Sequence, residues 1–129
     1  MIPGQKENHP TFKRSFLFAI QGFRTAWRNE RNIKVMVAGA LVSIVISIVL
    51  QIDLMSWALI LFCCGAVIAA ELLNTAIENV VDLVSPEYHP LAGRAKDVSA
   101  GAVWALCVMV AIVGLLVFLR AILMRVGVL

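Results

Sequence analysis

Charged side chains are scarce in this sequence. They make up 15% of its 129 residues, whereas hydrophobic residues make up 61%. Soluble domains carry about 25% charged residues, so this chain has too few of them to cover a water-facing surface. The composition argues against a soluble enzyme, a disordered tail and a nucleic-acid-binding module, and we expect no nucleic-acid partner. An integral membrane protein is the class that remains.

Several sequence motifs are also absent. The first 15 residues contain no continuous apolar core, so we expect no secretory signal peptide. Cys63, Cys64 and Cys107 lack the paired C-x-x-C spacing of a metal site, and we expect them to be packing residues. There is no Walker A motif and no G-x-G-x-x-G, so a nucleotide site would need a different framework.

Long uncharged segments dominate the sequence. Eighteen uncharged residues lie between Lys34 and Asp53, 17 between Asp53 and Glu71, and 22 between Asp97 and Arg120. About 20 apolar residues cross a membrane as a helix. We therefore predict an all-α integral membrane protein that forms one domain over residues 1–129, with transmembrane helices at 33–50, 54–84 and 92–123. Ser85–Pro86 ends the second helix, because proline lacks a backbone donor and clashes with the preceding turn.

The N-terminal segment, residues 1–31, shows a different pattern. Residues 1–10 are polar and irregular, and a helical pattern then begins. Its aromatic and aliphatic residues recur every three or four positions and so share one face, while basic residues gather on another. The apolar face comprises Phe12, Phe16, Ile20, Phe23 and Trp27. This pattern favours an amphipathic helix in the membrane interface. A helix docked on the bundle is the alternative.

The distribution of positive charge predicts the topology. Residues 1–34 hold seven lysines and arginines against two glutamates, which places this end in the cytoplasm. The connection at Gln51–Asp53 would face outward and the one near residues 85–97 inward. Arg120 and Arg125 would then lie outside, against the rule.

A polar stripe interrupts the second predicted span. Glu71, Asn74, Glu78 and Asp82 lie at offsets of 0, 3, 7 and 11, which keeps them on one helix face. An ionisable residue within a span indicates a functional site. The topology also brings Glu30 and Lys96–Asp97, at the mouths of the other two spans, to the same cytoplasmic interface.

The chemistry of this cluster suits phosphoryl transfer to a lipid hydroxyl. Carboxylates bind magnesium together with substrate phosphates, lysine and arginine hold phosphate oxygens, and a glutamate can act as general base. Simpler interpretations exist for each residue. Glu71 can be a proton carrier or a helix–helix hydrogen-bonding group, Glu78 and Asp82 solvated residues, and Lys96–Asp97 an interfacial anchor. His89 in the loop can be a solvent-exposed residue.

Three segments of the sequence resemble the prokaryotic diacylglycerol kinase family, which includes undecaprenol kinases. They are E-L-L-N-T-A-I-E-N-V-V-D from Glu71, P-E-Y-H-P-L-A-G-R-A-K-D from Pro86, and A-W-R-N-E-R-N around Glu30. The likeness extends from about Phe16 to Phe118. The combination of E-x-x-N-x-x-x-E with K-D is highly specific.

The resemblance implies a homotrimeric kinase of the bacterial cytoplasmic membrane that uses ATP and magnesium, with its active site on the cytoplasmic face. Glu71 would be the catalytic base and Asn74 would orient its carboxylate. Glu30 and Glu78 would be the magnesium ligands that bridge the ATP phosphates. Lys96 and Asp97 would contact the nucleotide.

The resemblance extends to further nucleotide-binding positions and to the acceptor. The loop residues that would border the nucleotide are Glu87, Tyr88 and His89. Phe18 and Arg14 stand where the family has a tyrosine and a lysine, and an arginine can still hold phosphate. Sequence features of both branches are present, so the acceptor is undecaprenol or diacylglycerol, with a slight preference for undecaprenol.

Two other classes of function provide alternatives. A proton-coupled small membrane transporter would also place one glutamate, Glu71, within a span. It would have no need of Lys96, Asp97 and a second helical glutamate at the interface. A non-enzymatic pore or assembly subunit would explain small residues within the spans, but not the carboxylate cluster.

Overall fold

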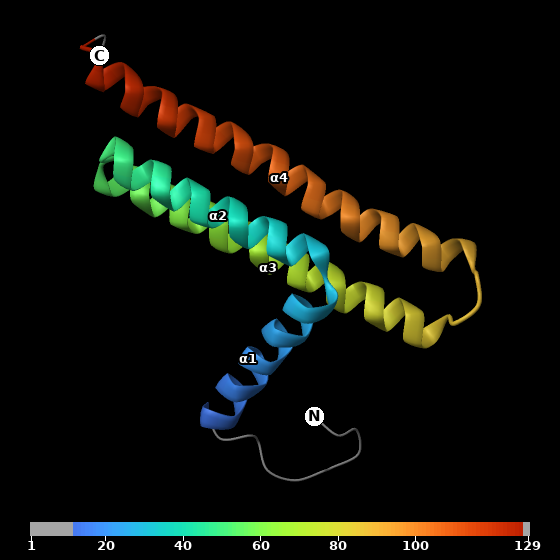
Figure 1. Ribbon diagram of the computed structural model, residues 1–129. Helices are drawn as coiled ribbons and strands as arrows, with labels where there is room; N and C mark the ends of the chain where they lie inside the picture. The colour runs from blue at the N-terminus through green and yellow to red at the C-terminus, as the bar shows by residue number, and fades with distance from the viewer. Residues whose placement is uncertain (1–11, 128–129) are drawn as a thin grey trace.

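The computed structural model describes residues 12–127 and contains four helices in this part of the chain (Figure 1). The irregular start expected for residues 1–10 lies outside the described residues. The four helices are α1 (Phe12–Asn29), α2 (Arg31–Leu50), α3 (Leu54–Val84) and α4 (Pro90–Arg125).

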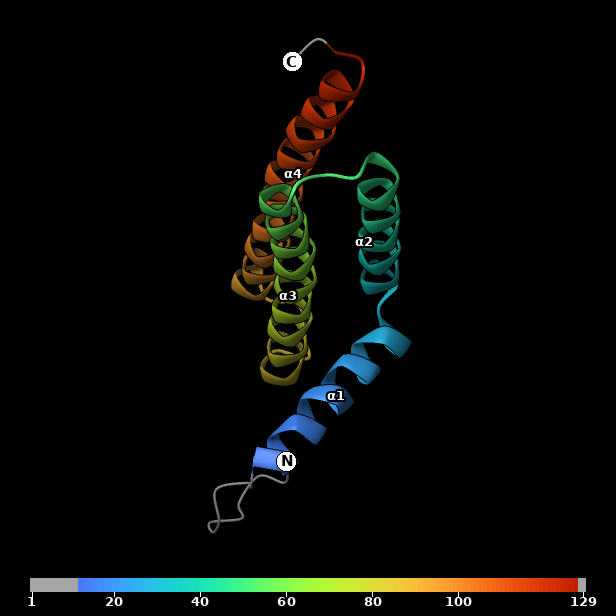
Figure 2. The ribbon, with the colours of Figure 1, turned by 90° about the vertical axis from the view of Figure 1, so that its left-hand side faces the viewer.

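Helix α3 is the central element and packs on both α4 and α2, while α1 leaves the bundle at an angle (Figure 2). Helices α2, α3 and α4 are long and apolar enough to cross a membrane. Large apolar side chains on them remain exposed, such as Leu41, Phe62 and Leu115. Apolar side chains exposed on the outside of a bundle suit a lipid environment, and the chain is an all-helical multi-pass membrane protein.

The ends of α2 and α3 follow from local backbone chemistry. Gln51 has φ 49° and ψ 50°, and this left-handed residue ends α2. Asp53 then caps α3, because its side chain accepts hydrogen bonds from the backbone N–H groups of Met55 and Ser56. Helix α3 continues to Val84, immediately before Ser85–Pro86.

The bounds of two of the expected helices differ from the structure. Helix α2 begins at Arg31 rather than at residue 33. Helix α4 covers Pro90–Arg125 rather than residues 92–123, because Pro90 occupies the first turn, where its missing N–H leaves no bond unmade. The His89 side chain caps the helix by accepting from the Leu91 N–H at 3.2 Å.

The end of the bundle near the α2–α3 turn is held by an apolar cluster and an ion pair. Ile52, Ile60 and Val117 form the buried cluster. Arg120 on α4 donates to the Asp53 carboxylate at 2.9 Å. Arg120, which the charge rule leaves on the unfavoured side, therefore has an acidic partner there.

Helix α1 exposes most of its surface, including Phe12 and Phe16, and buries only Ala26. It is separated from α2 by a single non-helical residue, Glu30, whose φ and ψ are −104° and 125°. The aromatic residues of α1 thus form an exposed apolar surface beside the bundle, and Phe23 stacks on Trp27.

Asp53 provides a test of the α2–α3 turn. Hydrogen bonds from the Ser56 side chain and backbone, together with the positive charge of Arg120, lower the pKa of Asp53 to about 2. Because this pKa is below the unfolded value, the stabilisation is present above about pH 4 and is lost as the pH falls towards 2. We expect the thermal midpoint at neutral pH to fall in the order wild type, Asp53→Asn, Asp53→Ala, since asparagine still caps the helix but lacks the charge.

The control for this series is Glu87→Gln, which removes one carboxylate from the other interhelical loop. Its thermal midpoint should remain near that of the wild type. Equal midpoints for wild type and Asp53→Asn at pH 7 would contradict a stabilising role for the ion pair.

Candidate functional site

The polar stripe of α3 is turned towards α4. Asn74 contacts Ser99 of α4, and Asp82 forms an ion pair with Lys96 of α4. The predicted common face of these residues is therefore the face along which the two helices meet. A spanning helix can place polar groups there without exposing them to hydrocarbon.

Asn74 is the centre of a hydrogen-bonded network. Its Nδ2 donates to Glu78 Oε1 at 3.0 Å, and its Oδ1 accepts from Ser99 Oγ at 2.6 Å. Ser99 Oγ also lies 2.9 Å from the carbonyl oxygen of Lys96. The expected role of Asn74 was to orient Glu71, but in the structure its amide donates to Glu78. Residues four apart on a helix are neighbours, so Glu78 is well placed to receive that bond.

Ser99 is the member of this network that sequence reasoning did not identify. It is buried on α4, three residues beyond Lys96. A single serine within an apolar helix is a weak signal, since its hydroxyl is often satisfied by the backbone of the preceding turn. Its position on the face of α4 that meets α3 is visible only in three dimensions.

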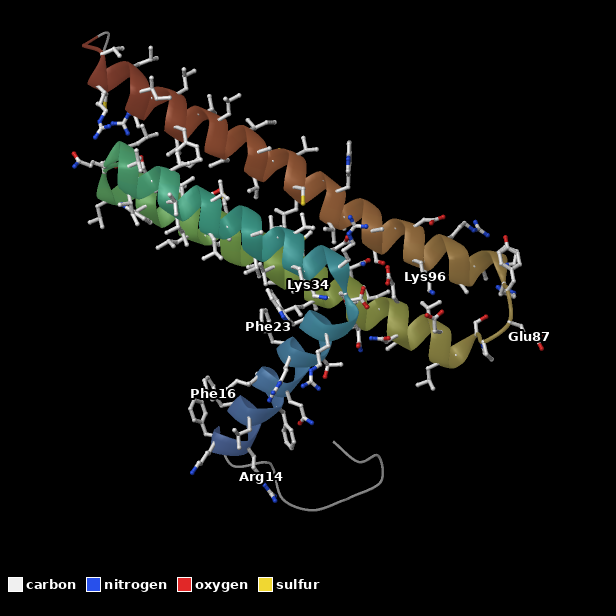
Figure 3. The ribbon with its side chains drawn as sticks, viewed as in Figure 1. Arg14, Phe16, Phe23, Lys34, Glu87 and Lys96 are labelled. Atoms are coloured by element: carbon white, nitrogen blue, oxygen red, sulfur yellow. The ribbon has the colours of Figure 1, made fainter. Side chains whose placement is uncertain are left out.

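Lys96 lies on the α3 side of α4, near the loop that carries Glu87 (Figure 3). Its Nζ donates to Asp82 Oδ1 at 2.5 Å. The Lys96 side chain is 36% exposed and that of Asp82 65% exposed, so water screens the pair. Lys96 is thus a cation held near the end of the polar stripe and accessible to a ligand.

Glu71 is the most deeply buried ionisable residue within residues 12–127, with 2% of its surface exposed. Within residues 12–127 no side chain or backbone group donates a hydrogen bond to its carboxylate. Glu71 lies 17 residues after Leu54, at the start of α3, and this separation corresponds to about 26 Å along the helix. A hydrocarbon core is about 30 Å thick, so the carboxylate lies near the far edge of the span.

A groove of about 740 Å³ lies between α1 and α3, with Glu30 at its end. From α1 it is lined by Phe18 and Phe23 among others, and from α3 by Thr75 and Asn79. The groove combines aromatic walls with polar groups near Glu30. That combination fits an amphiphilic ligand, which has both an apolar and a polar part.

Glu30 and Glu78 lie at a similar level along α3, but they are associated with different faces of it. The groove residues of α3 centre about 100° around the helix from the polar stripe. Across the described part of the chain, no three histidine, cysteine, aspartate or glutamate side chains gather as a metal site. Within one chain, Glu30 and Glu78 are thus two separate carboxylates and do not form a complete set of metal ligands.

The remaining predicted residues are spread over the chain. Arg14 is exposed near the start of α1, far from Lys96 and Glu87 (Figure 3). Tyr88 is 91% exposed in the loop, and Asp97 is exposed on α4. Phe18 lines the α1–α3 groove and His89 caps α4. The structure therefore brings together the stripe and Lys96, but leaves Arg14 apart from them.

Comparison with known proteins gives a consistent result. A family model described as prokaryotic diacylglycerol kinase matches residues 17–118. An undecaprenol kinase of Bacillus subtilis is 40% identical over 108 residues, which cover 84% of this chain and 88% of that protein. A diacylglycerol kinase of Helicobacter pylori is 36% identical over 78% of this chain and 79% of its own length. A diacylglycerol kinase of Escherichia coli is 38% identical over 67% of this chain and 70% of its own length.

The contact between Ser99 and Asn74 can be tested by a double-mutant cycle. We expect Ser99→Ala and Asn74→Ala to be coupled by about 0.6 kcal/mol, the average value for side-chain hydrogen bonds between membrane helices. The measurement is the free energy of unfolding in mixed micelles with increasing amounts of denaturing detergent.

A matched cycle pairs Ser47→Ala with Asn74→Ala. Ser47 is also a buried serine, but its hydroxyl donates to the Ser43 carbonyl oxygen and it has no contact with Asn74. This second pair should be additive. Equal coupling energies in the two cycles would show that the Ser99–Asn74 bond makes no specific contribution.

Proposed function

The chain belongs to the prokaryotic diacylglycerol kinase family, and from this premise we propose that it transfers the γ-phosphate of ATP to the primary hydroxyl of a membrane lipid. The observation that carries the proposal is the position of Glu71. Its carboxylate is buried in a spanning helix close to the edge of the hydrocarbon, and the cation of Lys96 lies on the neighbouring helix α4. A lipid hydroxyl lies at that depth.

In this mechanism Glu71 is the general base. Its carboxylate accepts the proton of the lipid hydroxyl while the hydroxyl oxygen attacks the γ-phosphorus. The bond from the γ-phosphorus to the bridging oxygen breaks and ADP leaves. Because no described group donates to the Glu71 carboxylate, it need not break a hydrogen bond within residues 12–127 to accept this proton. Asn74 accepts a hydrogen bond from Ser99 and donates one to Glu78, and these bonds hold the polar side chains next to Glu71 in place.

Lys96 is proposed to hold the phosphate oxygens. In the structure it donates to Asp82, so the phosphates would replace that carboxylate as its partner. Asp97, Glu87, Tyr88 and His89 would complete the nucleotide-binding side. The exposure of these loop and helix-mouth groups is compatible with binding a soluble nucleotide from water.

Magnesium is proposed as the cofactor, with Glu30 and Glu78 as its protein ligands. Both are carboxylates, and magnesium in phosphoryl-transfer sites is usually bound by one or two carboxylates plus substrate phosphates. This donor chemistry fits a magnesium ion that takes its remaining ligands from substrate phosphates and water. When bound, the ion would neutralise the negative charge of the phosphates.

The acceptor is proposed to be undecaprenol, giving undecaprenyl phosphate, with diacylglycerol and its product phosphatidic acid as the second candidate. The 40% identity to an undecaprenol kinase, compared with 36% and 38% to two diacylglycerol kinases, supports this order. Both lipids offer a primary hydroxyl at the interface. The aromatic walls of the α1–α3 groove suit either apolar tail.

A homotrimer in the bacterial cytoplasmic membrane is proposed as the working assembly, with the site on the cytoplasmic face and α1 in the interface. Arg14 and Lys96 are far apart in one chain, and a neighbouring copy could bring a second Arg14 to the site (Figure 3). The exposed aromatic residues and arginines of α1 support an interfacial position. Crosslinking in a mild detergent should give trimers, and a strictly monomeric active protein would contradict this assembly.

The first test of the function is Glu71→Gln. Loss of the base should lower phosphoryl transfer by about 10²- to 10⁴-fold. Transfer is measured in mixed micelles with ATP and magnesium, offering undecaprenol and diacylglycerol in parallel, and the faster acceptor identifies the branch. Asp53→Asn serves as a carboxylate-to-amide control at the other end of the bundle. Folded wild-type protein that phosphorylates neither lipid would exclude the kinase function.

The second test is Asp82→Asn. Removal of the carboxylate frees Lys96 and removes a negative charge that the ATP phosphates would have to displace. We expect the KM for ATP to fall about two- to fivefold with little change in kcat, the range set by an exposed ion pair. Asp53→Asn should leave the KM for ATP unchanged. A rise in KM in the Asp82 variant would show instead that Asp82 positions Lys96 for the nucleotide.

A further inference from the structure

A second pocket lies at the opposite end of the bundle from Glu30. It has a volume of about 320 Å³ and lies between the α2–α3 turn and the last turns of α4. Helix α2, with 20 residues, separates the two ends by about 30 Å. This is the thickness of a hydrocarbon core, so the pocket lies at the other membrane interface and is distinct from the kinase site.

The charged groups of this pocket are two arginines and one aspartate. Arg120, Arg125 and Asp53 all line it. The low pKa of Asp53 keeps its carboxylate ionised at neutral pH, so the pocket carries one net positive charge. Positive charge at a membrane interface attracts anionic lipid headgroups.

The Asp53 carboxylate is already satisfied by donors of this chain. It accepts from the backbone N–H groups of Met55 and Ser56, from the Ser56 hydroxyl and from Arg120. Within the described residues Arg125 forms no ion pair. One N–H of Arg120 is used by Asp53, and a guanidinium has five, so both arginines retain donors for a further anion.

The rest of the pocket is apolar. Leu50, Ile52, Val117, Ala121 and Met124 form its walls, and Ile52 and Val117 belong to the buried cluster beneath it. An inorganic anion gains no favourable contact from apolar walls. A phospholipid combines an anionic headgroup with acyl chains, and arginine matches the geometry of phosphate oxygens.

From the two guanidiniums and the apolar walls, we infer that this pocket binds the phosphate headgroup of an anionic phospholipid from the leaflet at the α2–α3 turn. Asp53 holds Arg120 in position, and Arg125 supplies a cation that has no ion-pair partner within residues 12–127. The inference concerns binding only and does not depend on the kinase function.

The test is lipid retention by the full chain in detergent, measured by native mass spectrometry. The probes are phosphatidylglycerol and phosphatidylcholine with identical acyl chains, and inorganic phosphate alone. We expect wild-type protein to retain phosphatidylglycerol in clear preference to phosphatidylcholine and not to retain inorganic phosphate. Arg125→Gln should weaken phosphatidylglycerol binding about tenfold, the effect of losing a charged hydrogen bond.

The matched control is Arg94→Gln, which removes an exposed arginine from the other end of α4, far from this pocket. It should retain phosphatidylglycerol like the wild type. Equal retention of the two lipids, undiminished retention by Arg125→Gln, equal loss in Arg94→Gln, or retention of inorganic phosphate would each overturn the inference. The comparison of lipids on the wild type needs no variant, so a poorly folded Arg125→Gln protein leaves the test decisive.

Discussion

Polar side chains on a membrane-spanning helix must find partners within the protein, and this constraint organises the whole bundle. Helix α3 carries a carboxylate, an amide and further acids on one face, and α4 covers that face. Ser99 and Lys96 are the partners that α4 supplies. These contacts give partners to Asn74, Glu78 and Asp82 and fix α3 against α4, while Glu71 is left without a donor among the described residues.

The fold could be predicted largely from the sequence because charge is so unevenly distributed. Uncharged runs mark the spans, and Pro86 marks the end of the longest apolar helix. The sequence predicts the start of α4 two residues late, because the loop pattern includes Pro90, although proline is acceptable in the first turn of a helix. The partner of Arg120 could not be predicted, since Asp53 lies 67 positions away along the chain.

The candidate site was predictable in its residue types but less so in its contacts. Spacing predicts that Asn74 shares a face with Glu71 and Glu78, and the resemblance implies that it orients Glu71. Only the structure shows that its amide donates to Glu78. Ser99 carries no charge and follows no motif, so nothing in the sequence distinguishes it from serines that bond to their own helix, such as Ser47. The assignment of the wider site rests on family membership rather than on one chain's geometry.

The hydroxyl of Ser99 has one hydrogen, yet two acceptors lie within its reach, Asn74 Oδ1 and the Lys96 carbonyl oxygen. It can donate to only one of them at a time. When the hydroxyl donates to the Lys96 carbonyl oxygen, Asn74 keeps its bond to Glu78 but has no described donor for its Oδ1. The same hydroxyl thus links the amide of α3 to the turn of α4 that carries Lys96, so a change at Ser99 would reach both helices at once.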